Sequence, residues 1–426
     1  MEDMRYPITL GTTPDGDLVR LPIEALKRHA VALGASGSGK TVLCKVVVEE
    51  CVRRGLPVIA VDPQGDLASL ALCGDPNTLE EMGVDPKIAA EYWSRVDVKI
   101  WTPGSTYGIP LSLAPSFQTA NIERYEDKVA AWGGIAAALA ALGGFKDEGS
   151  QVAFSMILEY ADEYGLLIEN LNDFIAFLVD PPVPLTERLD PIYDEKSRAK
   201  AARAFQIKMK GHNRLLFDLG RAIDIDRLYG YEPGGAVDHD KVRLSVIYLN
   251  TLNTQEDKEI FVAGLTQAMY QWMLREPSEE PVGLFYIDEV APYLPPVRKP
   301  ASKHGLMMLL RQARKYGVCC LLATQSPGDI DYKALAQTGT WALGKLATEQ
   351  EKAKVANALR SDAEVDAREI IDSLGSAGRG RFYLINSDHF EAPVETQVRW
   401  LVTEHKTLNV GAVESIVSDD DREIHG

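Results

Sequence analysis

The sequence has few cysteines. Among its 426 residues there are five, an odd set without C-x-x-C spacing: Cys44, Cys51, Cys73, Cys319 and Cys320. Most of them fall within otherwise apolar patterns, where a reduced cysteine packs as a small hydrophobic side chain. We therefore expect neither a disulfide framework nor a zinc site, and we expect a reducing compartment.

Long apolar runs are also lacking. The best candidate, residues 130–142, is shorter than the ~20 apolar residues that cross a bilayer and contains two glycines. The first ten residues have neither the basic nor the apolar region of a signal peptide. The sequence thus predicts a cytoplasmic protein without membrane insertion.

Basic residues are outnumbered. With 62 acidic and 45 basic residues, the chain has a formal net charge of -17. Because phosphate binding is driven by clustered Lys and Arg, this charge argues against a protein that coats nucleic acid with its whole surface. It leaves room for a local basic channel, and the length allows one large α/β domain with an insertion or two domains.

Residues 34–41, GASGSGKT, fit the phosphate-loop pattern G-x-x-x-x-G-K-[ST] at every fixed position. Small residues let successive backbone N–H groups curve around phosphates, and the following helix directs its positive end at them. In such a loop Lys40 reaches the β and γ phosphates and Thr41 binds Mg²⁺. A tight glycine-rich turn is the alternative. The candidate nucleotide-binding residues are Gly34, Ala35, Ser36, Gly37, Ser38, Gly39, Lys40, Thr41 and Val42.

The phosphate loop lies between an apolar strand at 30–33 and a helix at 41–54, and a second strand follows at 57–62. This order implies a right-handed crossover and a mainly parallel sheet, hence an α/β fold. Further runs rich in Val, Ile, Leu and aromatic residues are typical of strands buried on both faces, namely 98–101, 243–250, 283–288, 318–324 and 381–385.

The periodicity becomes helical in the middle of the chain. We therefore predict an α/β core at 30–114 and 236–415, interrupted by a helical insertion at 115–235. A short β-hairpin segment, 1–29, precedes the core, and an acidic, solvated tail, 416–426, follows it.

The strand at 283–287 ends in two acids. At the carboxyl edge of a parallel sheet Asp288 would hold Mg²⁺ and Glu289 would polarise the attacking water. An ordinary acidic helix start is the alternative. The strand at 318–324 is followed by Gln325, which could bond the γ-phosphate or the attacking water, or could merely cap the strand.

A helix is expected over 303–316, with Arg311, Arg314 and Lys315 on one face. The helix dipole favours basic residues in a last turn. In a ring-forming ATPase the same face can reach a neighbour's nucleotide, where an arginine stabilises the charge of the transition state. We favour Arg314 as this arginine finger, with Arg311, Arg379 and Arg381 as rivals.

These motifs together resemble the HerA/FtsK group of P-loop translocases, specifically the HerA-like ATPases. The resemblance covers about 10–72 and 242–401 and rests on GASGSGKT, VIAVDPQGDL, LFYIDEV, RQARKYGV and LLATQSPGDI. It implies a RecA-like core that uses ATP and Mg²⁺, a homohexameric ring and movement of double-stranded DNA. It also implies that Arg314 matches the trans-acting arginine and that Asp62 and Gln325 line the γ-phosphate side.

This sequence departs from the family in two places. The family often has His where this chain has Gln64, and it usually carries a β-barrel where this chain has about thirty residues before the phosphate loop. Arg28, just before the first core strand, is either a further nucleotide contact or a surface residue.

Two functions follow as candidates. The first is a hexameric DNA translocase or helicase that works with a separate nuclease or effector. The second is a regulatory NTPase, or one coupled to secretion or conjugation, that remodels a protein partner without moving DNA. Candidate DNA contacts, which could equally form a solvated helix face, are Lys196, Arg198, Lys200, Arg203, Lys208, Lys210 and Arg214.

Overall fold

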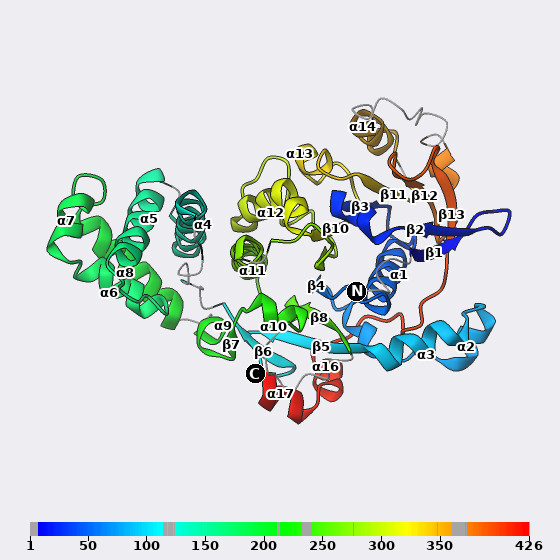
Figure 1. The fold of residues 1–426 in the computed structure, drawn as a ribbon, viewed down its shortest axis with the longest axis horizontal. Coiled ribbons are helices and arrows are strands. Elements are labelled where there is room, and N and C mark those ends of the chain that lie inside the picture. Colours follow the sequence, from blue (N-terminus) through cyan, green and yellow to red (C-terminus); the bar gives the residue numbers. More distant parts are fainter. Residues whose placement is uncertain are drawn as a thin grey trace.

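The structure is a computed structural model that describes residues 7–113, 117, 122, 124–145, 147–210, 214–231, 241–275, 277–346, 348–359, 371 and 373–425. Its centre is a thirteen-stranded sheet in the order β2-β1-β13-β12-β11-β3-β10-β9-β4-β8-β5-β6-β7 (Figure 1). The strands are β1 (Ile8–Thr12), β2 (Leu18–Leu21), β3 (Ala30–Leu33), β4 (Val58–Asp62), β5 (Val96–Pro103), β6 (Ile109–Ser112), β7 (Arg221–Ala222), β8 (Val242–Tyr248), β9 (Gly283–Ile287), β10 (Val318–Thr324), β11 (Thr340–Leu343), β12 (Arg381–Ile385) and β13 (Val394–Val398).

The described helices surround this sheet. They are α1 (Lys40–Arg53), α2 (Pro76–Glu81), α3 (Pro86–Arg95), α4 (Tyr125–Gly143), α5 (Glu148–Glu163), α6 (Leu171–Val179), α7 (Val183–Leu189), α8 (Glu195–Lys210), α9 (Arg214–Asp218), α10 (Ile225–Tyr229), α11 (Gln255–Arg275), α12 (Ala301–Gln312), α13 (Tyr332–Leu335), α14 (Glu349–Leu359), α16 (Val410–Ile416) and α17 (Asp419–His425).

The centre of the sheet is parallel. β3 pairs with β10 and β11, β9 pairs with β10 and β4, and all of these pairs run in parallel. Every residue of β3, β4, β9 and β10 is buried, which explains why their sequences are apolar runs without alternation. Because parallel strands end at the same edge, the segments that follow these four strands gather there.

Antiparallel strands extend the sheet beyond β11. β12 pairs with β11 and β13, and the hairpin β1–β2 joins β13 through β1. The hairpin is thus part of the main sheet. β6, β7, β11 and β13 were not among the strands expected from the sequence, because they are short or carry polar residues.

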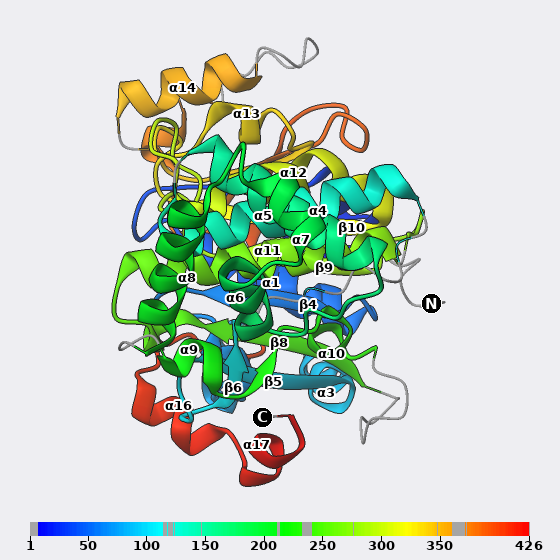
Figure 2. The ribbon, with the colours of Figure 1, turned by 90° about the vertical axis from the view of Figure 1, so that its left-hand side faces the viewer.

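Helices form layers on both sides of the central strands. In Figure 1, α1 lies on one side of β3, β10 and β4, and α11 and α12 lie on the other. The insertion contributes α4–α8, which form a helical lobe beyond α11, with α4 packed against α11 (Figure 2). The lobe is therefore attached to the layer of helices that covers the sheet.

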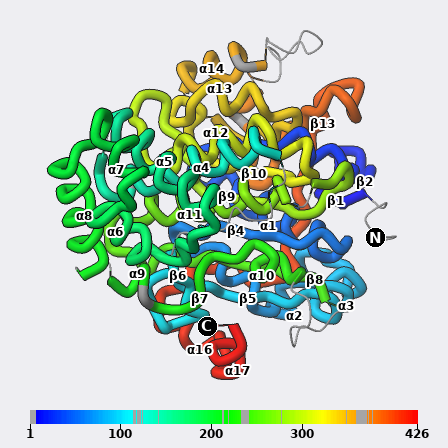
Figure 3. Tube along the Cα trace, turned by 60° about the vertical axis from the view of Figure 1, so that its left-hand side comes forward, coloured from blue at the N-terminus to red at the C-terminus, as the bar shows by residue number. Residues whose placement is uncertain are grey.

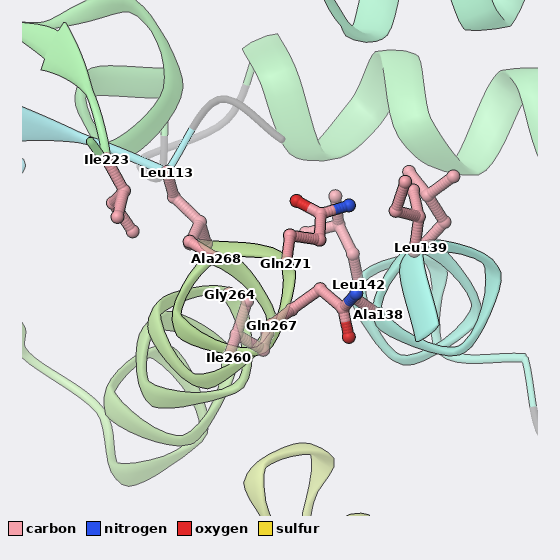
Figure 4. A pocket seen from close by; sticks show the side chains of 11 residues that line it. Leu113, Ala138, Leu139, Leu142, Ile223, Ile260, Gly264, Gln267, Ala268 and Gln271 are labelled. Carbon is pink, nitrogen blue, oxygen red and sulfur yellow. The ribbon is translucent and has the colours of Figure 1, made fainter. Parts of the chain in front are cut away.

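Small residues let α4 approach α11 closely. A Cβ atom on Gly134 would lie 2.4 Å from the side-chain oxygen of Gln267. Beside this contact is a mainly apolar cavity of about 50 Å³, into which Gln267 and Gln271 extend from α11 (Figure 4). The interface between the helical lobe and the core thus contains a close contact between α4 and α11 and a small cavity beside it.

The acidic segment expected at 416–426 is helical and packed where the structure describes it, while Asp419, Asp420 and Glu423 are exposed. Residues 419–425 form α17, which packs against β6 at the lower edge of the sheet (Figure 3). Asp421 pairs with Lys99 of β5 at 2.6 Å, and His425 is 6% exposed with its ring 5.9 Å from that of Trp101. One acid of this segment, Asp421, therefore meets a basic residue of the core. Across the described ranges, no helix has the length and apolarity that a bilayer crossing requires.

Replacing Gly11 by alanine should detach the hairpin from the sheet. The new Cβ would lie 2.0 Å from the backbone oxygen of Gln397 in β13, so the strands must separate. We expect the free energy of unfolding to fall by about 1–3 kcal/mol in urea denaturation. Gly133→Ala is the control, since its Cβ meets no atom within 4 Å and helix propensity should raise stability by up to about 1 kcal/mol. Equal effects of the two changes would contradict this account of the hairpin.

Candidate active site

The phosphate loop connects β3 to α1, and two glycines set its shape. Gly37 and Gly39 have φ angles of 77° and 95°, in the region that favours glycine. A Cβ on Gly39 would also lie 3.0 Å from the backbone nitrogen of Gly380. Gly380 in turn donates its N–H to the Ser38 carbonyl at 2.8 Å. The chain segment before β12 therefore packs against the phosphate loop and is hydrogen-bonded to it.

Lys40 and Glu289 meet although they lie far apart in the sequence. Lys40, the first residue of α1, places its Nζ 3.2 Å from Oε2 of Glu289. The other carboxylate oxygen of Glu289 accepts a hydrogen bond from Thr324 Oγ1 at 2.9 Å. Glu289 has a φ of 52°, which is uncommon for a residue other than glycine. Its carboxylate is thus held in place from both sides.

Asp288 is a buried carboxylate beside this pair. Its Oδ1 accepts a hydrogen bond from the hydroxyl of Tyr286 at 2.9 Å. Burial raises the pKa of Asp288, whereas Lys40 and the Tyr286 hydroxyl act in the opposite direction. A divalent cation nearby would further favour the ionised form. Oxygen donors of this kind, from Asp288 and from the Thr41 hydroxyl, are the ligands that Mg²⁺ prefers.

Asp62 organises the loop after β4. Its two carboxylate oxygens accept hydrogen bonds from five successive backbone N–H groups, those of Gln64, Gly65, Asp66, Leu67 and Ala68. The side chain is fully buried, and burial raises its pKa to about 6, although these N–H groups oppose the shift. Asp62 therefore fixes the backbone conformation of this loop.

A cavity of about 320 Å³ joins the elements just described. The residues that line it are Ala35, Ser36, Gly37, Ser38, Gly39, Lys40, Thr41, Val42, Gln64, Asp66, Asp288, Glu289, Gln325, Arg379, His405, Lys406 and Thr407. Most of the predicted nucleotide and magnesium residues thus lie together. Gly34 and Asp62 are not among the lining residues.

The sequence analysis did not identify some of the residues that line this cavity. Asp66 stands two residues beyond Gln64 in the VDPQGD stretch, where its acidic character was the available signal. Arg379 was considered only as a rival finger, but it lines the cavity of its own chain. His405, Lys406 and Thr407 carry no recognisable pattern and come from the segment after β13.

The other candidate arginine fingers, Arg311, Arg314 and Arg381, do not line this cavity. Arg311 and Arg314 line a separate cavity of about 280 Å³ together with Arg28 and His29. Burial lowers the pKa of His29 to about 4, and the charge of Arg314 adds to the shift. Both Arg311 and Arg314 are exposed, and neither forms an ion pair with another described residue.

Two other arginines singled out in the sequence do form ion pairs. Arg28 pairs with Asp388. Arg381, another rival, pairs with Glu395 at 3.4 Å.

Comparison with known proteins agrees with this site. The family described as "Helicase HerA-like C-terminal" matches residues 8–181, a range that contains the phosphate loop and the VDPQGD stretch. This match confirms the resemblance to the HerA-like ATPases. No curated protein matches the chain by sequence.

Solved structures show the same fold at low sequence identity. VirB4 of Thermoanaerobacter pseudethanolicus has a TM-score of 0.59 and 14% identity, covering 92% of this chain and 96% of that one. The plasmid coupling protein TrwB in complex with ADP and Mg²⁺ has a TM-score of 0.55 and 15% identity, covering 96% and 93%. The predicted RecA-like P-loop NTPase fold, with a mainly parallel sheet, is therefore confirmed.

Replacing Glu289 by glutamine should stop turnover while preserving nucleotide binding. The amide keeps the size of the side chain but cannot accept a proton from water, so we expect a fall in kcat of at least about 100-fold. Phosphate release and binding of ATP can be measured on the same sample. The control is Lys40→Ala, which should lose binding as well. Rapid hydrolysis by the Glu289→Gln protein would show that another group is the base.

Proposed function

We propose that the protein is a Mg²⁺-dependent ATPase that forms a homo-oligomeric ring, a hexamer, and moves double-stranded DNA. The observation that carries the proposal is the position of Glu289, fixed between Lys40 and Thr324 at the mouth of the phosphate loop. The proposal further includes a separate nuclease or effector protein that uses the moved DNA. The match to a helicase family supports this choice.

The chemistry follows from the cavity. The amides of the phosphate loop and Lys40 would hold the phosphates, while Thr41 and Asp288 would hold Mg²⁺, which neutralises charge on the phosphate oxygens when bound. Glu289 would accept a proton from the attacking water. Gln325 lies in the same cavity and would orient that water. All of these residues line the same cavity.

The ring is supported by the place of the arginines. Arg311 at the end of α12, and Arg314 in the following turn, Ala313–Tyr316, lie outside their own chain's nucleotide cavity. An exposed arginine without an ion pair in the described structure is suited to a phosphate of another subunit. We assign the finger to Arg314 and leave Arg311 as the neighbouring candidate.

Contact with DNA is supported by one face of α8. Four basic side chains recur three, four and seven residues apart along its exposed side, Lys196, Lys200, Arg203 and Lys210. None of the four forms an ion pair with another described residue. Arg198, by contrast, is buried and pairs with Asp190. Lys208 lies 3.6 Å from Glu256. The four exposed cations are therefore the part of this segment that can meet phosphates.

A second function has specific support. The fold is shared with a plasmid coupling protein, and the net charge of -17 favours protein partners over binding of DNA by the whole surface. A regulatory or conjugation-coupling NTPase would use the same ATP chemistry to remodel a protein partner. It differs from the first function in its response to DNA.

Linear duplex DNA should stimulate ATP hydrolysis at low salt if the protein is a translocase. DNA affinity should fall with salt by about 0.9 in log-log slope for each phosphate contacted. Replacing Lys196, Lys200, Arg203 and Lys210 with glutamine should reduce this slope by up to about 3–4 and weaken stimulation. Lys200→Gln alone can be compared with Lys87→Gln, which removes one exposed charge from α3. Hydrolysis that is indifferent to DNA would favour the second function.

Mixing two inactive proteins tests the finger. Arg314→Ala subunits keep an intact phosphate loop, and Lys40→Ala subunits keep the arginine, so mixed rings contain some complete sites. We expect ATP hydrolysis by the mixture to exceed the sum of the separate activities. The same mixture with Arg381→Ala in place of Arg314→Ala is the comparison. Absence of any recovery would count against a role of Arg314 in a neighbouring site.

A further inference from the structure

Residues 399–408, which follow β13, form a segment that we call the C-terminal strap. The strap extends from the antiparallel edge of the sheet to the nucleotide cavity, which it lines with His405, Lys406 and Thr407. The sequence beyond it continues into α16 and α17. None of the motifs recognised in the sequence includes this segment.

Buried charges of α1 attach the first part of the strap to the phosphate-loop helix. The Glu49 carboxylate accepts hydrogen bonds from Val402 N at 3.0 Å, Thr403 N at 3.0 Å and Thr403 Oγ1 at 2.8 Å. Lys45 donates to the carbonyl of Glu404 at 2.9 Å. Since a buried charge without partners is costly, these contacts fix the strap relative to α1. The same helix begins at Lys40.

The loop after β4 attaches the other end of the strap. Leu408 donates its N–H to the Gly65 carbonyl at 2.8 Å, and Thr407 donates its hydroxyl to Asp66. The approach is close, because a Cβ on Gly65 would lie 2.4 Å from the Leu408 carbonyl oxygen, and Gly65 has a φ of 95°. His405 and Lys406 are therefore held between two fixed points, at the cavity.

Of the strap residues that line the cavity, Lys406 carries a permanent positive charge. Lys406 pairs with Glu404 on the strap itself at 2.5 Å, and half of its side chain is exposed. Partial burial lowers the pKa of His405, and the charges of Lys45 and Arg379 add to this shift, whereas Asp66 opposes it. Lys406 is thus the strap's positive charge in a cavity that Lys40 and Arg379 also line.

We propose that the strap forms a wall of the nucleotide site within its own subunit and that Lys406 binds the phosphate chain of the nucleotide. This inference rests on the proposed ATP-binding function. On binding, the Lys406 ammonium exchanges the Glu404 carboxylate for a phosphate oxygen, and no covalent bond changes. The backbone of the strap stays in place, because α1 and the β4 loop hold it on both sides.

Binding of two probes to the full chain tests the proposal. Calorimetric titration with ADP and Mg²⁺ and with pyrophosphate and Mg²⁺ reports the nucleotide and the phosphate chain separately. Lys406→Ala should weaken both ligands by about tenfold or more, since a charged hydrogen bond is lost. Lys406→Arg should restore most of the affinity. Lys87→Ala, which removes an exposed charge from α3, should change neither.

The outcomes are distinguishable. If Lys406→Ala binds both probes as the unmodified protein does, the strap makes no phosphate contact and the inference is overturned while ATP binding stands. If only ADP binding weakens, the residue contacts the nucleoside, and the phosphate assignment is again wrong. If the unmodified protein binds neither probe, the proposed function itself fails, and the inference fails with it.

Discussion

The contact between Lys40 and Glu289 is the interaction on which the site depends. The two residues are 249 positions apart, yet their charged atoms lie 3.2 Å from each other. This distance is possible because β3 and β9 both pair in parallel with β10, so the phosphate loop and the acidic pair follow strands that end at one edge. The unusual backbone of Glu289 is maintained by its hydrogen bond to Thr324, a form of local strain that is common at functional sites.

The helix that follows the phosphate loop, α1, has two roles along its length. Its first residues face the nucleotide cavity, and its later residues Lys45, Glu49 and Glu50 are buried charges. Glu50 is paired with Arg53 and Arg399, and Glu49 also accepts from Arg399. The helix therefore connects the chemistry at its beginning to the C-terminal strap at its side. Changes along this helix can act on nucleotide binding without touching the nucleotide.

Motifs with fixed spacing made the centre of the molecule predictable. The α/β fold and most of the cavity are specified by three features of the sequence. These are GASGSGKT, the apolar strands that end in Asp62 and in Asp288–Glu289, and the helical stretch before residue 210. Parallel strands buried on both faces leave a clear apolar signal, and phosphate chemistry restricts the residues at their ends. Lys406 and Thr407 could not be found in this way, because tertiary contacts bring their segment to the cavity, from Lys45 to the Glu404 carbonyl and from Thr407 to Asp66. The packing of the tail was not foreseen for the same reason: the contact between Asp421 and Lys99 joins residues 322 positions apart.

The attachment of the helical lobe has an evolutionary consequence. The lobe leaves the sheet after β6 and returns before β7, two adjacent strands in which Leu111 pairs with Arg221 and Ser112 with Ala222. Entry and exit points are therefore neighbours, so the intervening hundred or so residues resemble a cassette. Such a cassette can be lengthened, shortened or exchanged between relatives while the catalytic edge, many strands away, keeps its geometry. A change confined to the lobe thus alters the surface available to partners while the nucleotide cavity is kept.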